Sequence, residues 1–543
     1  MEKLNTTIVI PALRLNSNFR GDLLRKFGGI SLLQRAIDKA VLIGGKKAVL
    51  LFSDIEEATL IGERNSIRVV SSVSPSEEIS QQILRAVVAH NVSDCDQHGR
   101  ITMAVVSPYS PLMKAETIEK AIRSLEDRRG NLVLVPISQK RIAPSRGPAT
   151  GLSDDLFAVK RRTEFVDSTA FSVVQFQQQD ALSNLVFKRT DFPVSDDALE
   201  VFTQRDWQAS NKLLDMRRVV LRVIGAKRVG MGHIYRCLSL AHEMIDHRVT
   251  FVCCEEDDIA IRELTAYDYE LQVFDKKDMV SEILRLEPDL VVNDILDTQS
   301  TDVDPLVEAR VKVVNFEDLG VGANRASLTI NELYDTPVVE GENILWGKQY
   351  FFLRDEFMDA CPQEFSQVVS SILIVFGGTD QHDLSRKVFD QVSEFCRERG
   401  IHIYIVTGPG YENYQELKDQ VQGEDGVSIT HSTGVISKIM EATQLAITSN
   451  GRTVYELAHM NIPAIVIPLH DREKTHGFAC EANGFVPMNP YEEGVTEKRV
   501  LQTLRDLTDD HRWRRMLFEA TEKITFVGNK RRVYQLINDL VSD

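Results

Sequence analysis

A histidine that follows two glycines is the feature of this sequence best suited to chemistry. Residues 230–240 read Gly-Met-Gly-His-Ile-Tyr-Arg-Cys-Leu-Ser-Leu, so His233 stands where a helix is expected to begin. Backbone N–H groups at a helix start point outward with the positive end of the helix dipole, which suits a phosphate or another anion. The same field disfavours the imidazolium form of His233, which leaves the ring able to accept a proton. The segment predicts an anion beside a general base, although a Gly-His turn that simply ends a strand fits the same residues.

The neighbouring residues predict the elements that must position this histidine. An apolar run over residues 219–224 precedes it, and apolar residues recur behind it at helical spacing, at Leu238, Leu240, Ala241 and Met244. The predicted order is therefore strand, glycine loop, helix. Further along the chain, short Val/Ile/Leu runs alternate with helical stretches, which predicts parallel sheets covered by helices on both faces. Ligands of such sheets bind beyond the carboxyl ends of the strands.

The segment Gly-x-Gly-His-x-x-Arg-Cys-Leu-x-Leu-Ala at residues 230–241 resembles the opening of the UDP-sugar hydrolases of pseudaminic acid biosynthesis. Three later segments resemble the same family in the same order. Residues 347–357 match its Tyr-x-x-Leu-Arg-x-Glu-Phe segment, and residues 372–380 match its second glycine loop. Residues 447–457 match the Ser-x-Gly-x-Thr-x-x-Glu-Leu segment of UDP-sugar enzymes with the GT-B fold. The resemblance implies two Rossmann-type lobes on either side of a cleft, over residues 219–361 and 362–543.

The resemblance also implies a reaction. In these hydrolases the second lobe holds the uridine diphosphate, and a histidine of the first lobe activates a water molecule that attacks the anomeric carbon of the sugar. Carried over, His233 is the catalytic base, a UDP-sugar is the substrate, and neither a cofactor nor a metal is expected. Glu456 is placed to accept hydrogen bonds from the ribose hydroxyls. The residues implied to bind the substrate are Gly230, Gly232, Arg236, Asp294, Gly377, Gly378, Thr379, Asp380, Ser449, Asn450, Gly451, Arg452, Thr453 and Glu456.

The sequence leaves alternatives open for the roles of two residues, the sugar and the function. The same pattern is compatible with Glu456 as a solvated carboxylate on a helix and with Arg452 as a charged surface residue. Leu296 stands where the family has the tyrosine of an Asp-x-Tyr segment, so a hydroxyl that would contact the sugar is missing and the identity of the sugar is open. The expected substrate is a UDP-linked amino-6-deoxyhexose of a nonulosonic acid pathway. The other functions considered are a GT-B-type glycosyltransferase, in which His233 deprotonates an acceptor hydroxyl, and a silent binding protein.

Residues 1–212 resemble a second family, the cytidylyltransferases that make CMP-sialic acid. The similar segments are residues 10–12 (Ile-Pro-Ala), 28–33 (Gly-Gly-Ile-Ser-Leu-Leu), 53–57 (Ser-Asp-Ile-Glu-Glu) and 107–112 (Ser-Pro-Tyr-Ser-Pro-Leu). The resemblance implies a nucleotidyltransferase-like Rossmann-type domain. The whole chain is thus predicted to be an α/β protein in which this domain precedes the GT-B-like pair of lobes.

The chemistry of this first domain is predicted to be lost. Cytidylyl transfer builds negative charge on the transferring group, so it needs basic side chains and a carboxylate-held magnesium ion. Phe202 stands in place of the metal-binding aspartate. The family's basic residues are replaced by Leu13, Ser17, Asn18, Asp22 and Met113. An inactive scaffold that supports a homodimer is the favoured interpretation, while a transferase with altered chemistry and a CMP-nonulosonate synthetase remain alternatives.

The composition limits the other classes of function. The 543 residues predict roughly three or four domains, and the formal net charge of −17 argues against a general nucleic-acid surface. No apolar run approaches the roughly eighteen residues of a membrane helix. The first residues resemble neither a signal nor a transit peptide, so we expect a cytoplasmic protein without membrane contact. Seven cysteines without a Cys-x-x-Cys pair favour reduced thiols over metal ligands or disulfides.

Overall fold

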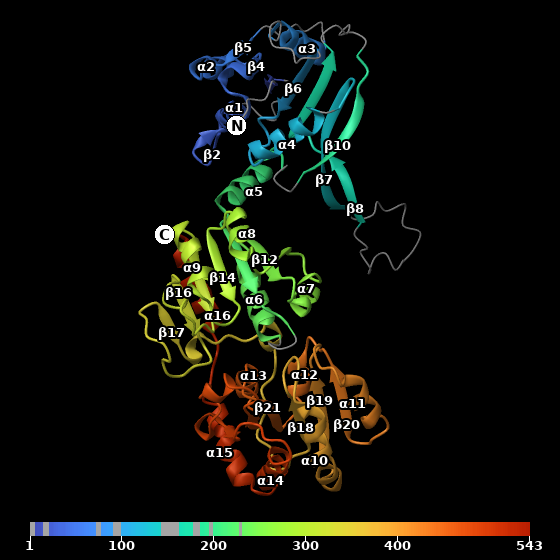
Figure 1. The fold of residues 1–543 in the computed structure, drawn as a ribbon, viewed down its shortest axis with the longest axis vertical. Coiled ribbons are helices and arrows are strands. Elements are labelled where there is room, and N and C mark those ends of the chain that lie inside the picture. Colours follow the sequence, from blue (N-terminus) through green and yellow to red (C-terminus); the bar gives the residue numbers. More distant parts are fainter. Residues whose placement is uncertain are drawn as a thin grey trace. The chain divides into compact units, whose positions relative to one another are not determined.

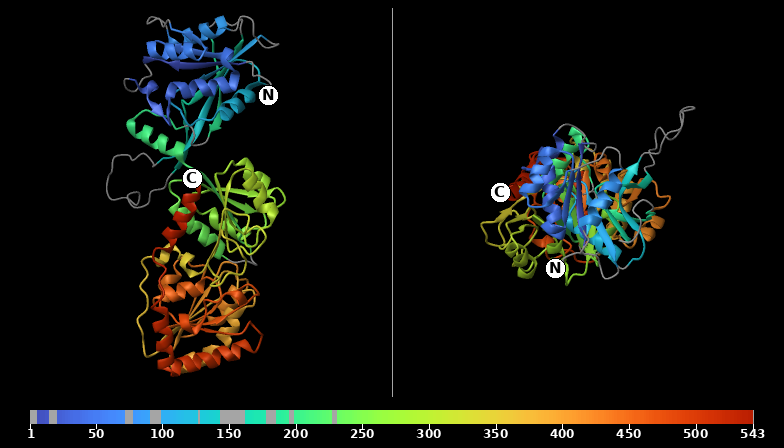
Figure 2. Two further views of the ribbon diagram at one scale, coloured as in Figure 1. Left: turned by 90° about the vertical axis from the view of Figure 1, so that its left-hand side faces the viewer. Right: turned by 90° about the horizontal axis from the view of Figure 1, so that it is seen from above.

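The protein folds into two units, shown from three directions in Figures 1 and 2. In this computed structural model, contacts between Cα atoms divide the chain into Met1–Met216 and Arg217–Asp543. The division falls between helix α5 (Gln204–Asp215) and strand β11 (Arg218–Val223). The structure describes residues 6–14, 21–71, 78–90, 99–126, 128–142, 162–177, 185–194, 199–226 and 231–542.

The first unit is built on one mixed sheet of eight strands. The strand order is β10-β7-β9-β6-β1-β4-β5, and β8 pairs with β7. Strands β5, β4, β1 and β6 run parallel, whereas β9 is antiparallel to both β6 and β7. The strands of this sheet are β1 (Thr7–Ala12), β4 (Val49–Ser53), β5 (Arg68–Val70), β6 (Arg100–Val106), β7 (Leu132–Ile142), β8 (Arg162–Asp167), β9 (Phe171–Gln177) and β10 (Lys188–Val194).

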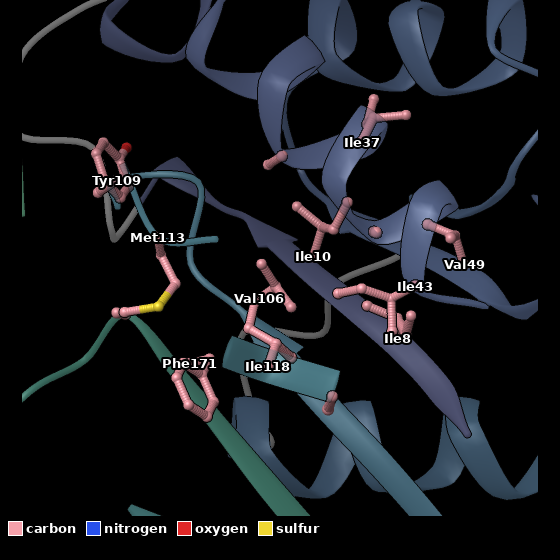
Figure 3. Close-up of a cluster of buried hydrophobic side chains, with 14 of the residues drawn as sticks. Ile8, Ile10, Ile37, Ile43, Val49, Val106, Tyr109, Met113, Ile118 and Phe171 are labelled. Carbon is pink, nitrogen blue, oxygen red and sulfur yellow. The ribbon is translucent and has the colours of Figure 1, made fainter. Parts of the chain in front are cut away.

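Helix α1 (Leu32–Gly44) illustrates how the sequence builds the core of this unit. The side chain of Ser31 accepts a hydrogen bond from the backbone N–H of Gln34 and so caps the helix N-terminus. The buried face of the helix includes Ile37, which belongs to one hydrophobic cluster with Ile8 and Ile10 of β1 (Figure 3). The short hairpin of β2 (Lys26–Phe27) and β3 (Ile30–Ser31) precedes α1, and the other helices are α2 (Glu56–Arg64), α3 (Ile79–His90), α4 (Ala115–Glu126) and α5.

Three residues at positions where the resembled cytidylyltransferases have basic side chains are buried in the first unit. Leu13 and Met113, which stand in place of basic residues, are buried in hydrophobic clusters. Asp22 is also buried, and its carboxylate accepts a hydrogen bond of 3.1 Å from the Tyr109 hydroxyl. These three side chains therefore point into the unit. The remaining positions are Phe202, which is half-exposed, and Ser17 and Asn18, which lie outside the described residues.

The second unit contains two all-parallel sheets, which confirms the predicted α/β fold with two Rossmann-type lobes. The order in the first lobe is β13-β12-β11-β14-β15-β16-β17, and that in the second lobe is β20-β19-β18-β21-β22-β23. The strands of the first lobe are β11, β12 (Arg248–Cys254), β13 (Glu270–Phe274), β14 (Leu290–Asp294), β15 (Lys312–Phe316), β16 (Leu328–Asn331) and β17 (Ile344–Trp346). Those of the second lobe are β18 (Ser371–Val375), β19 (His402–Thr407), β20 (Val427–His431), β21 (Leu445–Ser449), β22 (Ala464–Ile467) and β23 (Phe485–Pro487).

The helices of the second unit cover both sheets, and the last one returns to the first lobe. Helix α16 (Asn529–Ser542) contributes Val533, Ile537 and Val541 to the same hydrophobic cluster as Leu221 of β11. The range predicted for the second lobe, 362–543, therefore contains a helix that packs on the first lobe. Helices of the first lobe are α6 (Gly232–Glu243), α7 (Asp258–Leu264), α8 (Met279–Arg285) and α9 (Ser300–Glu308). Those of the second lobe are α10 (Leu384–Arg399), α11 (Tyr414–Val421), α12 (Ile436–Met440), α13 (Thr453–His459), α14 (Thr496–Asp509) and α15 (His511–Thr521).

The strand and helix predicted around His233 are present as β11 and α6. Val223, the last residue of β11, pairs with Asp294, the last residue of β14, in the parallel register of the sheet. The chain leaves β11 at this edge and enters α6, so the helix start and the end of β14 are neighbours. Among the described helices, none has both the length and the apolar character to cross a membrane.

Candidate active site

A cavity in the second unit is lined by residues at the carboxyl ends of strands in both lobes. The first lobe contributes Met231, Gly232 and Tyr235 at the start of α6, and the segment between the lobes contributes Arg354. Ligands of parallel α/β sheets bind at this end of the strands, so this cavity is the candidate active site. The second lobe contributes Val375, Gly377, Gly378, Val406, Thr407, Gly408, Pro409, Ser432, Thr433, Ile436, Arg452, Thr453 and Glu456.

Two glycines allow the close approaches that shape this cavity. A Cβ atom on Gly408 would lie 2.4 Å from the backbone of Gly378, so only glycine lets the loops after β18 and β19 touch. A Cβ atom on Gly232 would lie 3.1 Å from Cδ of Arg452. The first turn of α6 therefore leaves space for an arginine that comes from the second lobe.

Four non-glycine residues with left-handed backbone conformations follow strands at the same edge. They are Leu296 (φ 71°), Glu317 (φ 52°), Asp380 (φ 38°) and Ser432 (φ 51°). Each such conformation costs on the order of 1 kcal/mol or more, and such residues cluster at functional sites. Their position agrees with a ligand site at the strand ends.

His233 forms a buried pair with Asp294. Nδ1 of His233 lies 2.5 Å from Oδ1 of Asp294, whose side chain is fully buried. Burial opposes ionisation of Asp294, but Arg236 and His233 outweigh it and hold the pKa of this carboxyl well below its usual value. An ionised carboxylate at Nδ1 keeps the proton on that nitrogen and leaves the lone pair of Nε2 free to accept one. No hydrogen bond within the described residues engages Nε2, so this nitrogen is able to accept a proton. His233 itself is not among the residues that line the cavity, although Gly232 and Tyr235 on either side of it are.

Arg236 holds the carboxylate of this pair from the other side. It lies one turn after His233 on α6, and its Nε and Nη2 donate to the two oxygens of Asp294 at 2.7 and 2.5 Å. Burial opposes the charge of Arg236, but Asp294 and Glu317 together raise its pKa. The predicted substrate ligands Arg236 and Asp294 therefore lie behind the cavity wall, where they orient His233.

The network continues across the lobes through Glu332. Nη1 of Arg236 donates to Oε1 of Glu332 at 2.8 Å, and Nη1 of Arg452 forms an ion pair with the same oxygen. Nη2 of Arg452 donates to the backbone carbonyl of Phe352 at 2.9 Å. Burial, together with the like charge of Arg236, lowers the pKa of Arg452 to about 10. Arg452 is thus a partly buried cation at the cavity wall, engaged by Glu332 and Phe352, and not a solvated surface charge.

Glu456 is held by Arg354, which also lines the cavity. Oε1 of Glu456 accepts from Nε of Arg354 at 2.8 Å, and only 6% of Glu456 is exposed. The guanidinium of Arg354 also pairs with Glu356 at 2.9 Å and lies 5.1 Å from the ring centre of Tyr235. Glu456 is therefore not a solvated helix carboxylate. Its carboxylate lines the cavity with one oxygen already engaged.

The other predicted residues divide into two groups. Gly232, Gly377, Gly378 and Thr453 line the cavity with Arg452 and Glu456. Asp380 instead accepts from the backbone N–H groups of Leu384 and Ser385 and so caps α10, and Asn450 donates to the carbonyls of Glu473 and His476. Outside the lining of the cavity lie Thr379, Asp380, Ser449, Asn450 and Gly451, and Gly230 lies outside the described residues.

Three residues of the site were not predicted from the sequence as functional residues: Tyr235, Arg354 and Glu332. Arg354 stands in the Leu-Arg-x-Glu-Phe segment that was recognised without a role for the arginine. Tyr235 follows His233 by two residues, and Glu332 follows β16 directly at the edge where functional residues gather. In the part of the chain that the structure describes, no three His, Cys, Asp or Glu side chains are grouped to hold a metal ion.

Part of the second lobe is similar to a known domain family. Residues 372–512 match the glycosyltransferase family 28 C-terminal domain. The uncharacterized protein MJ1062 of Methanocaldococcus jannaschii is 27% identical over 270 residues, which cover 46% of this chain and 55% of that protein. The spore coat polysaccharide biosynthesis protein SpsG of Bacillus subtilis is 22% identical over 260 residues, which cover 45% of this chain and 75% of that protein. The chain thus spans about half the length of the first relative.

Solved structures with similar folds include MurG of Acinetobacter baumannii, at 13% identity and a TM-score of 0.45. The match covers 60% of this chain and 99% of that one. Anabaena Alr3699/HepE in complex with UDP and glucose is 14% identical with a TM-score of 0.40, and the match covers 60% and 99% of the two chains.

Proposed function

We propose that the second unit is an enzyme that hydrolyses a UDP-linked sugar to UDP and the free sugar. The observation that carries the proposal is the His233–Asp294 pair at the start of α6, next to a cavity lined by both lobes. The resemblance of four segments to UDP-sugar hydrolases and the family 28 match of residues 372–512 support the nucleotide-sugar part of the proposal.

The reaction follows from the free lone pair of Nε2. A water molecule gives a proton to Nε2 while its oxygen attacks the anomeric carbon of the sugar. The bond between that carbon and the diphosphate oxygen breaks, and UDP leaves with the electron pair. Asp294 stabilises the imidazolium that forms, and Arg236 keeps Asp294 ionised and in place. The proton later returns to solvent.

The nucleotide is proposed to bind at the second lobe. Arg452 and Thr453 at the start of α13 and the backbone of Gly377 and Gly378 are placed to contact the diphosphate. Glu456 keeps a carboxylate oxygen for the ribose hydroxyls, since Arg354 engages Oε1. The sugar is proposed to be an amino-substituted 6-deoxyhexose of nonulosonic acid synthesis, on the basis of the hydrolase resemblance. SpsG is named for the biosynthesis of a spore coat polysaccharide, which is compatible with such a sugar.

A glycosyltransferase is the second candidate, because residues 372–512 match a glycosyltransferase domain. The same base would then take the proton from an acceptor hydroxyl instead of from water. The first unit is proposed to be a degenerate cytidylyltransferase-like scaffold that supports a homodimer. Burial of Leu13, Met113 and Asp22 in that unit supports its loss of activity.

The test is to incubate the full chain with a panel of UDP-diacetamido-6-deoxyhexoses in water enriched in ¹⁸O and to analyse both products. Hydrolysis at the anomeric carbon predicts UDP without label and free sugar with one ¹⁸O atom. Release of UDP only after an acceptor is added supports the transferase instead. Label in the phosphate of UDP contradicts attack at the anomeric carbon.

A further inference from the structure

Glu332 connects the two lobes through a single carboxylate oxygen. Its side chain is fully buried directly after β16, and Oε1 accepts from Arg236 of the first lobe and from Arg452 of the second. Its other oxygen, Oε2, is buried without a hydrogen-bond partner. Two guanidinium groups therefore compete for one acceptor, and they repel each other.

Arg452 is the member of this pair that a ligand can reach. Its side chain is 14% exposed and lines the cavity, whereas that of Arg236 is 1% exposed. Burial and the nearby charge of Arg236 lower the pKa of Arg452 to about 10, although the carboxylates of Glu456, Asp294 and Glu317 act in the opposite direction. Its guanidinium is therefore the one that an anion in the cavity would contact.

Arg236 transmits the position of Glu332 to the base. Its guanidinium is planar and holds Glu332 through Nη1 while Nε and Nη2 hold Asp294. Because the guanidinium is planar and its donor directions are fixed, a shift of Glu332 at Nη1 changes how Nε and Nη2 hold Asp294. Asp294 in turn sets the orientation of His233 through Nδ1.

We propose that Glu332 is a positioning residue that couples anion binding at Arg452 to the alignment of the His233–Asp294 pair. The identity of the anion, the diphosphate of UDP, rests on the proposed function. In the structure, Glu332 divides its interaction between two arginines. A diphosphate competes for Arg452, and Glu332 then acts on Arg236 alone, which holds Asp294 and His233 more firmly. The base is thus aligned when the nucleotide is in place.

The coupling predicts opposite effects of one substitution on binding and on turnover. In Glu332→Gln the carboxylate no longer competes with the nucleotide for Arg452, so UDP should bind about tenfold more tightly. Turnover should fall at the same time, because a neutral amide holds Arg236 weakly. A residue with only a structural role would weaken binding or leave it unchanged. Glu317→Gln is the matched control, since Glu317 is a similarly buried carboxylate 3.9 Å from Arg236 that acts on Arg452 through its charge and not through an ion pair.

UDP affinity is measured by calorimetry on the full chain, with circular dichroism to verify folding. Three results together support the coupling. UDP binds more tightly to Glu332→Gln than to the wild type, and its affinity for Glu317→Gln is unchanged. In an Arg452→Gln background, Glu332→Gln gives no gain in affinity. Unchanged or weaker binding in folded Glu332→Gln overturns it. A wild-type protein that binds no UDP contradicts the proposed function itself, which separates the two failures.

A second measurement does not depend on the Glu332 variant. In the full chain labelled with ¹⁵N-histidine, UDP should shift the ring resonances of His233, assigned with His233→Asn. The coupling predicts that this shift is lost in Arg452→Gln at saturating UDP. A shift of equal size in that variant reports a direct effect of the ligand and overturns the coupling.

Discussion

His233 and Asp294 are separated by 61 residues in sequence and joined by a 2.5 Å contact between Nδ1 and a carboxylate oxygen. The contact exists because β11 and β14 are adjacent parallel strands that end at the same level. Arg236 donates to both oxygens of the same carboxylate. The aspartate is therefore fixed before any substrate binds, and it fixes the histidine tautomer in turn.

Replacement of the carboxylate should remove the correct tautomer. In Asp294→Asn the amide N–H₂ donates to Nδ1, so the ring proton moves to Nε2 and the base is lost; we expect turnover to fall by about 10³- to 10⁴-fold. UDP affinity by calorimetry should change little, because Asp294 does not line the cavity. Asp302→Asn is the control, since that carboxylate pairs with Arg222 in the same lobe. Comparable turnover in Asp294→Asn and wild type would remove Asp294 from the mechanism.

The buried carboxylate also predicts a pH dependence of stability. The pKa of Asp294 is lowered in the folded state, so its contribution to stability is fully present above the unfolded value of about 3.9 and is lost as pH falls through the folded value. Urea unfolding should therefore show that Asp294→Asn destabilises the second unit more at pH 7 than at pH 3. If wild type and Asp294→Asn differ by the same free energy of unfolding at pH 7 and at pH 3, this explanation is contradicted.

Glu456 and Glu356 form a matched pair for testing the ribose site. Both pair with Arg354, but only Glu456 lines the cavity, while Glu356 accepts from the backbone N–H and hydroxyl of Ser437. Glu456→Gln should weaken UDP binding by about 1.5 to 3 kcal/mol at most, because a charged acceptor becomes neutral. Glu356→Gln should leave UDP affinity nearly unchanged. An equal loss of UDP affinity in both variants would mean that Glu456 supports UDP binding only by holding Arg354.

The sequence predicted the elements of the site better than the contacts between them. The glycine loop and apolar spacing around His233 are local, and they gave β11 and α6 correctly. The partner of Nδ1 depends on strand order and register, so Asp294 was predicted as a substrate ligand rather than as a support for the base. The contact of Arg452 with Glu332 spans 120 residues and two lobes, and no local pattern marks it.

Polar residues beside glycine motifs proved hardest to interpret from sequence. Asp380 and Asn450 belong to the recognised motifs, yet their side chains bond to backbone groups of their own lobe. Asp and Asn readily make such local hydrogen bonds, so a motif position does not separate a loop-stabilising role from a ligand contact. Leu13 and Met113 show the reverse case, because apolar replacements of charged residues predict burial directly.

The first unit should not make CMP-sugars. Leu13 and Met113 are buried apolar residues and Asp22 is a buried acid, so none of the three supplies the positive charge that cytidylyl transfer needs. We expect no pyrophosphate from the full chain with CTP, magnesium and a nonulosonic acid in a coupled assay, with an active cytidylyltransferase as the positive control. Pyrophosphate release that requires both CTP and the acid would show that the first unit is an active enzyme.

His233 is proposed to be the base of a UDP-sugar hydrolase, and one pair of variants tests this role most directly. His242 lies on the same helix but is exposed and paired with Asp355, so His242→Ala serves as the matched control for His233→Ala. On a UDP-sugar that the wild type hydrolyses, His233→Ala should lose about 10²- to 10⁴-fold in turnover with nearly unchanged UDP affinity, because a base acts on the transition state. His242→Ala should retain activity. Equal turnover of His233→Ala and wild type would contradict the account.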